Sequence, residues 1–131
     1  MLFTLPQIEG KIREFTGIMY APDEFIPTFG YTTQTGLPHI DIEKGHYLLI
    51  VCERGVELSR ERFKDPDALL FKVLHDISFS MAFDSIAEDA NYQNYKTRLL
   101  QTQKNIISKV NGYFVATEKQ SQHDSLTTEL V

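Results

Sequence analysis

The sequence predicts an α+β domain, in which a three-stranded antiparallel meander packs against an N-terminal helix and two C-terminal helices. Towards both ends of the chain, apolar residues recur at intervals of three and four, the spacing of amphipathic helices. In the middle, short apolar or alternating segments are separated by two-residue turns, as in antiparallel strands. At 131 residues and 42% hydrophobic content, the chain can form one core of its own. We expect this single domain to cover residues 1–116, and the polar residues 117–131 to form a disordered C-terminal tail.

The first predicted helix covers residues 5–16, where apolar side chains follow the helical period. Thr4 is placed to cap its N-terminus and Gly17 to end it. A connection rich in proline and glycine follows as far as Pro38. It carries four large apolar residues, so we expect it to pack on the domain rather than extend into solvent. These residues are Phe25, Ile26, Phe29 and Tyr31.

Three strands are expected next. The pairs Lys44–Gly45 and Arg54–Gly55 provide hairpin turns, because glycine readily adopts the positive φ that such turns need. The segment between the two turns is continuously apolar over residues 47–52, which favours a central strand buried on both faces. The predicted strands cover residues 39–43, 46–53 and 56–63.

The second helix has the strongest start signal in the chain, Asp65-Pro66-Asp67. It supplies a capping carboxylate, a proline at the first helical position and a second acid near the positive end of the helix dipole. This helix carries two apolar stripes, so two sides of it need cover. A last helix is expected over residues 92–110, ended by Gly112. The residues predicted to lie in the core are Ile40, Ile42, Val56, Leu58, Leu70, Val73, Leu74 and Ile77.

Charge and cysteine content limit the classes of function. The chain has 13 basic and 18 acidic residues and a net charge of −5. This argues against binding to nucleic acid or to an anionic membrane, and is compatible with a basic protein partner. Cys52 is the single cysteine, which excludes an internal disulfide and favours a reducing compartment, so we expect a cytoplasmic protein. The longest apolar run is far too short to cross a membrane.

No catalytic, cofactor-binding or metal-binding residue is predicted, and the chain is not expected to be an enzyme. Sequence motifs for nucleotide, zinc or serine-hydrolase chemistry are absent. His39, Asp41 and Glu43 share one side of a strand, but one strand makes a poor metal cage, and we read them as its solvent-facing half. Cys52 is interpreted as a buried structural thiol rather than a nucleophile. His75, flanked by phenylalanines one turn away on either side, is interpreted as a partly buried side chain rather than a pH switch.

The order of several short motifs resembles the Immunity protein 63 family of bacterial polymorphic toxin systems. The resemblance covers residues 26–82. It rests on Pro27-Thr28-Phe29-Gly30-Tyr31, Pro38-His39-Ile40, Glu53-Arg54-Gly55-Val56-Glu57 and Phe79-Ser80-Met81-Ala82. Gln103 also stands where the last helix of that family carries a glutamine. The resemblance implies a cytosolic α+β protein that protects its producer by binding and blocking a cognate toxin, without catalysis.

Strand alternation indicates where such a partner would bind. If Ile40 and Ile42 face the helices, the side chains that alternate with them face away. Together with the outward side chains of the strand at residues 56–63, these would form an acidic rim around an apolar centre. The predicted toxin-binding residues are Asp41, Glu43, Glu57, Glu61 and His39. The alternative is that the helix at residues 5–16 covers this face. The turn geometry leaves open whether the centre consists of Leu48, Ile50 and Cys52 or of Tyr47, Leu49 and Val51.

The partner expected from the resemblance is a protein toxin domain, of which a basic nuclease is one candidate. We expect no nucleic-acid or membrane partner, and a monomer or weak homodimer. The competing hypothesis is a small-molecule-sensing or adaptor domain with a pocket between sheet and helices near His75. A third hypothesis is a small hydrolase that uses His39 and Asp41.

Overall fold

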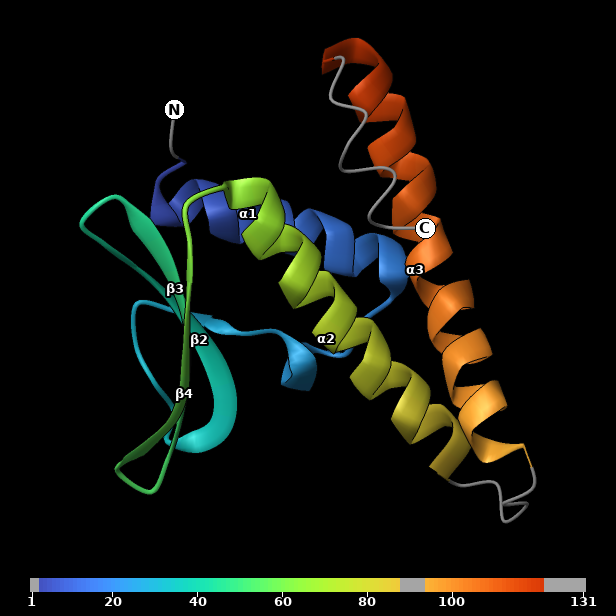
Figure 1. Cartoon of the computed structure of the whole chain (residues 1–131), viewed down its shortest axis with the longest axis horizontal. Helices are drawn as coiled ribbons and strands as arrows, with labels where there is room; N and C mark the ends of the chain where they lie inside the picture. Colours follow the sequence, from blue (N-terminus) through green and yellow to red (C-terminus); the bar gives the residue numbers. More distant parts are fainter. Residues whose placement is uncertain (1–2, 88–93, 122–131) are drawn as a thin grey trace.

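The fold is α+β, with a four-stranded mixed sheet and three helices (Figure 1). The computed structural model describes residues 3–87 and 94–121, and side chains up to residue 110 within them. The elements in chain order are α1 (Leu5–Met19), η1 (Asp23–Phe25), β1 (Thr28–Phe29), β2 (Thr35–Glu43), β3 (His46–Glu53), β4 (Val56–Phe63), α2 (Pro66–Ala87) and α3 (Tyr95–Ser121).

The sheet contains the predicted meander and one further strand. β2 pairs with β3, and β3 with β4, both antiparallel. The strand β1 pairs with the outer edge of β2 in parallel, with Thr28 opposite His39. The prediction of three purely antiparallel strands is therefore wrong in this detail. A two-residue strand is too short to show any periodicity, and it forms because the connection after α1 runs along the edge of β2.

Both hairpin turns have the geometry expected from their glycines. Lys44 and Gly45 have φ values of 51° and 76°, and Arg54 and Gly55 have 52° and 80°. Two successive positive φ values define the type I′ turn, whose twist matches that of the strands on either side. These turns fix the pairing of the three long strands, so the predicted meander is confirmed.

Helix α1 begins where the sequence predicts but ends later. The Gln7 backbone N–H donates to Thr4 Oγ1 at 3.3 Å, and the Thr4 N–H donates to Gln7 Oε1 at 2.8 Å, which is a capping box. The predicted end at Gly17 is wrong. Met19 is only 1% exposed, and its burial extends the helix until Tyr20 adopts a left-handed φ of 58°.

One core lies between the sheet and the helices. Figure 1 shows all three helices on the same side of the sheet. Ile40 of β2 and Leu49 of β3 pack with apolar residues of α1, α2 and α3. The remaining predicted core residues of β2 and α2 are buried or partly buried there: Ile42, Leu70, Val73, Leu74 and Ile77.

Val56 and Leu58 were predicted to be buried, and this is wrong because each is 57% exposed. The pairing of β3 with β4 is irregular at this point. Val51 pairs with Ser59 and Cys52 pairs with Glu57, so Leu58 has no partner on β3. This β-bulge shifts the alternation of β4 by one residue. In addition, the β3–β4 turn lies at the end of the sheet far from the start of α2 (Figure 1).

Helix α3 packs along α2 and is longer than predicted. It starts at Tyr95 and continues past Gly112 to Ser121, so the predicted end is wrong. The amide nitrogen of Gln103 donates to the His75 backbone oxygen at 3.1 Å and to Ser78 Oγ at 3.3 Å, linking the two helices. The tail predicted from residue 117 overlaps the end of α3, and its remainder lies outside the described residues.

The cap of α2 can be tested by substitution. The Asp67 N–H donates to Asp65 Oδ1 at 2.9 Å, which is the predicted capping bond. We expect Asp65→Ala to lower the free energy of unfolding by about 1 kcal/mol, and Asp65→Asn, which retains the acceptor, to cost only a few tenths of that. Urea unfolding measures both. An equal loss in the two variants would show that Asp65 acts through its charge and not as a cap.

Candidate functional site

The candidate site is the outer face, defined as the side of β2, β3 and β4 that points away from the helices. Tyr47 and Leu49 of β3 lie in the core, so the side chains that alternate with them point outward. Directly paired residues of neighbouring strands share a face of the sheet. The residues of β2 and β4 that pair with outward residues of β3 therefore point outward as well. The outer face consists of His39, Asp41, Glu43, Leu48, Ile50, Cys52, Glu57, Arg60 and Arg62.

No helix of the described chain covers this face. The buried residues of α1, such as Ile8 and Ile12, belong to the same core as Leu49. The alternative that α1 covers the outer face is therefore wrong. The open question about the centre of the face is also answered, because Leu48, Ile50 and Cys52 point outward.

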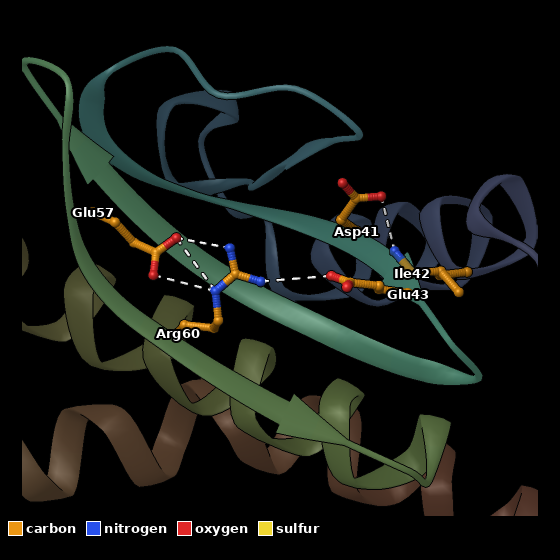
Figure 2. Close-up of polar contacts among 5 residues, drawn as sticks. All are labelled: Asp41, Ile42, Glu43, Glu57 and Arg60. Atoms are coloured by element: carbon orange, nitrogen blue, oxygen red, sulfur yellow. Dashed lines mark hydrogen bonds and ion pairs between the residues drawn. The ribbon is translucent and has the colours of Figure 1, made fainter.

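Arg60 organises the charges on this face. Its Nη2 lies 2.8 Å from Glu57 Oε1, its Nε lies 3.2 Å from Glu57 Oε2, and its Nη1 lies 3.8 Å from Glu43 Oε2. Figure 2 shows the Arg60 guanidinium extending from β4 over the middle strand towards Glu43 on β2. Hydrogen bonding to Arg60 lowers the pKa of Glu57, and the same contact raises the pKa of Arg60.

The bulge explains how Glu57 and Arg60 come together. In a regular strand, residues three apart point to opposite faces, since successive side chains alternate. The extra residue Leu58 restores them to the same face. The bidentate contact between guanidinium and carboxylate fixes both orientations, although its exposure to solvent keeps its contribution to stability small.

Side chains of the sheet itself cover the apolar centre. Leu48 and Ile50 are 4% and 5% exposed, although no described helix lies over them. Arg62 and Arg60 pair with them on β4, and arginine stems can lie over apolar atoms while the charged ends remain in water. The result is a shallow apolar floor beneath charged side chains.

The predicted site residues are only partly brought together. Asp41, Glu43 and Glu57 lie on the outer face, and Asp41 Oδ1 accepts a hydrogen bond from the Ile42 N–H at 2.9 Å. The expectation that Glu61 faces outward is wrong. It pairs with Leu49 on the inner side of β4, and its Oε1 lies 3.8 Å from Lys72 Nζ of α2. The bulge causes this change, because it reverses the alternation of β4.

His39 lies on the outer face but is 7% exposed. Its Nδ1 is buried, and no partner for it is found in the described part of the chain. It forms part of the floor and offers little surface to a partner. Arg60 and Arg62 were not predicted to belong to the site, because the outward orientation of both depends on the bulge. Their presence makes the charge of the face nearly balanced rather than strongly acidic.

Among the side chains that the structure describes, no group of three histidine, cysteine or carboxylate residues is arranged to hold a metal ion. Within the same residues, no helix is long and apolar enough to cross a bilayer. Cys52 is a free thiol on the outer face and is partly exposed, so the interpretation of Cys52 as buried is wrong.

His75 lies beside a shallow hollow of about 460 Å³ on α2. Its ring stacks on Phe71 with centroids 4.3 Å apart, and no partner for its buried Nε2 is found among the described residues. Burial lowers the pKa of His75, against a smaller opposing effect of Asp76. Phe79 and Phe83 continue the same stripe and are 43% and 45% exposed. The second apolar stripe is therefore covered only in part.

Comparison with known proteins identifies a family. The model of a family described as Immunity protein 63 matches residues 43–124, which is more than half of the chain. The match begins at the end of β2 and includes α2 and α3, so it continues well beyond residue 82. No curated protein and no solved structure gives a significant match.

The lowered pKa of His75 predicts a pH-dependent stability. The unfolded chain has the ordinary histidine pKa near 6.5, so below that pH it binds more protons at His75 than the folded chain does. Stability from this group is present above about pH 6.5 and is lost as the pH falls towards the folded pKa. We expect His75→Gln to lose less stability than the wild type between pH 7.5 and 5.5 in urea unfolding. Between pH 7.5 and 8.5 the two proteins should change equally, and equal losses in the acidic range would contradict the prediction.

Proposed function

This chain belongs to the Immunity protein 63 family, and we propose that it protects the cell that produces it by binding a cognate toxin and blocking it by contact. The family match carries this proposal, because the name of the family describes an immunity function. The family also suggests a non-catalytic role. In this proposal, protection depends on the affinity of one protein surface for another.

The outer face supports the proposal as a candidate contact surface. It is free of helices in the described part of the chain and has an apolar floor formed by Leu48 and Ile50. Asp41, Glu43 and Glu57 surround this floor, and Arg60 already holds two of these carboxylates in place. Side chains fixed before binding lose less conformational entropy when the complex forms.

The charge of the chain favours a basic toxin. A net charge of −5 attracts a basic domain over several ångströms and raises the association rate, and salt screens this effect. A nuclease with a basic cleft is one toxin class with this property. We propose that the rim carboxylates contact the basic surface of such a toxin.

Charge reversal of the rim tests the contact surface. We expect the triple variant Asp41→Lys, Glu43→Lys, Glu57→Lys to bind the toxin domain encoded beside this chain at least tenfold more weakly, equivalent to about 1.4 kcal/mol. Calorimetric Kd values at physiological salt measure this, and thermal melting checks that the fold persists. Glu61→Lys is the matched control, because it reverses a carboxylate of β4 on the opposite side of the sheet.

Two other outcomes would contradict the proposal at different levels. If the triple variant binds as tightly as the wild type, the outer face is not the contact surface. If the wild type neither binds nor protects against the toxin encoded beside it, the proposed function itself is wrong.

A further inference from the structure

A cleft of about 210 Å³ lies between η1, the start of β2 and the middle of α2. Its floor is apolar and reaches the core at Leu49, Val73 and Ile77, all of them buried. Two exposed carboxylates, Glu24 and Asp76, lie at its opening. The remaining lining residues are Phe25, Pro27, Gly36, Leu37, Pro38 and Ser80.

Two further hollows extend this cleft along the connection between α1 and β2. One shares Pro27 and Leu37 with the cleft and has a volume of about 320 Å³, and the other shares Glu24 and Phe25 and has about 370 Å³. Together the three form a continuous recessed surface, which we call the connection surface. It is separate from the outer face, but both surfaces include residues of β2.

The lining of the connection surface is strongly acidic. Five carboxylates line its three hollows, and among the described residues lining them the only basic side chain is that of Arg13. Arg13 is already paired, because its Nε lies 2.9 Å from Glu9 Oε2. Lys72, next to the cleft, pairs with Asp76 at 3.1 Å. The acidic lining residues are Glu9, Asp23, Glu24, Asp76 and Asp84.

Two exposed tyrosines extend this surface at its ends. Tyr20 is 81% exposed and lines one outer hollow, and Tyr31 is 62% exposed and lines the other. Exposed tyrosines are enriched at protein interfaces, where the ring is buried and the hydroxyl stays hydrated. An apolar cleft surrounded by acids and tyrosines has the composition of a binding hot spot for a basic protein.

We infer that the cleft between η1, β2 and α2 receives one apolar side chain from a basic loop of the toxin, whose flanking lysine or arginine residues pair with Glu24 and Asp76. This inference rests on the proposed function and names the anchoring point of the same partner. The volume of the cleft suits a side chain such as leucine, and its carboxylates lie at the opening, where flanking charges would stand. A partner that binds along the β1–β2 edge of the sheet reaches both this cleft and the outer face.

Toxin binding by charge-neutral variants tests the inference. We expect the double variant Glu24→Gln, Asp76→Asn to raise the Kd for the toxin domain at least tenfold, with a smaller effect at high salt. Ser80→Trp, which fills the cleft, should weaken binding at any salt concentration. Glu61→Gln is the matched control, because Glu61 also pairs with Lys72 but does not line the cleft.

A second measurement does not need the toxin. In a ¹⁵N NMR titration, the peptide acetyl-Lys-Leu-Lys-amide should shift the amide signals of Gly36, Leu37, Ile77 and Ser80. The peptides acetyl-Lys-Ser-Lys-amide and acetyl-Glu-Leu-Glu-amide should shift them much less, because one lacks the apolar anchor and the other the charge. Ser80→Trp should abolish the shifts.

The outcomes separate the two proposals. Equal shifts with all three peptides, or shifts scattered over the surface, would overturn the cleft as a site. Unchanged toxin affinity in both cleft variants would overturn its role in toxin binding, even if the outer-face variants lose affinity. A wild-type protein that does not bind the toxin at all would overturn the proposed function, while the peptide titration would still decide whether the cleft binds.

Discussion

The packing of all three helices on one side of the sheet is the constraint on which the rest of the structure depends. Ile40 and Leu49 are covered by apolar side chains of the helices, which removes the centre of the inner face from solvent. Nothing comparable covers the outer face in the described chain, so its central residues must be protected by their neighbours in the sheet. The arginines of β4 have this role, and their charged ends give the face its polar character.

A polar contact between α2 and α3 complements this apolar packing. Helix α2 is apolar on more than one side, so apolar contacts alone would allow α3 to pack at several rotations and heights. Gln103 removes this freedom, because its amide reaches the His75 carbonyl oxygen and Ser78 Oγ, and Ser78 is fully buried. The Gln103 amide is half-buried, and leaving it unpaired would cost free energy in any other arrangement. The glutamine that the family resemblance singled out therefore has a structural explanation.

Local signals allowed much of the fold to be predicted. Thr4 and Asp65 start helices by hydrogen bonds within three residues, and Gly45 and Gly55 permit turns at fixed positions. The helix ends could not be predicted in this way. A glycine inside a helix costs about 1 kcal/mol, which the burial of a side chain such as Met19 offsets. The strand β1 has too few residues to leave a pattern.

The candidate site was predictable where the strand is regular and not where it is interrupted. Asp41 and Glu43 of β2 lie on the expected face. On β4 the bulge at Leu58 moves Glu61 to the inner side and brings Arg60 to the outer side. A bulge depends on the pairing between two strands, and the alternation of side chains along one strand does not predict it. The acidic connection surface was missed because its residues come from α1, η1 and α2, which only tertiary structure brings together.

The bulged strand has a further consequence for the behaviour of the protein in a crowded cell. β4 is an edge strand, and its free side offers unpaired backbone groups to any extended chain it meets. Regular, flat, apolar edges recruit such chains and seed aggregation. Here the irregularity at Leu58 interrupts the row of backbone donors and acceptors, and closely spaced charges of both signs follow it as far as Arg62. The same residues that shape the outer face thus oppose indiscriminate strand addition.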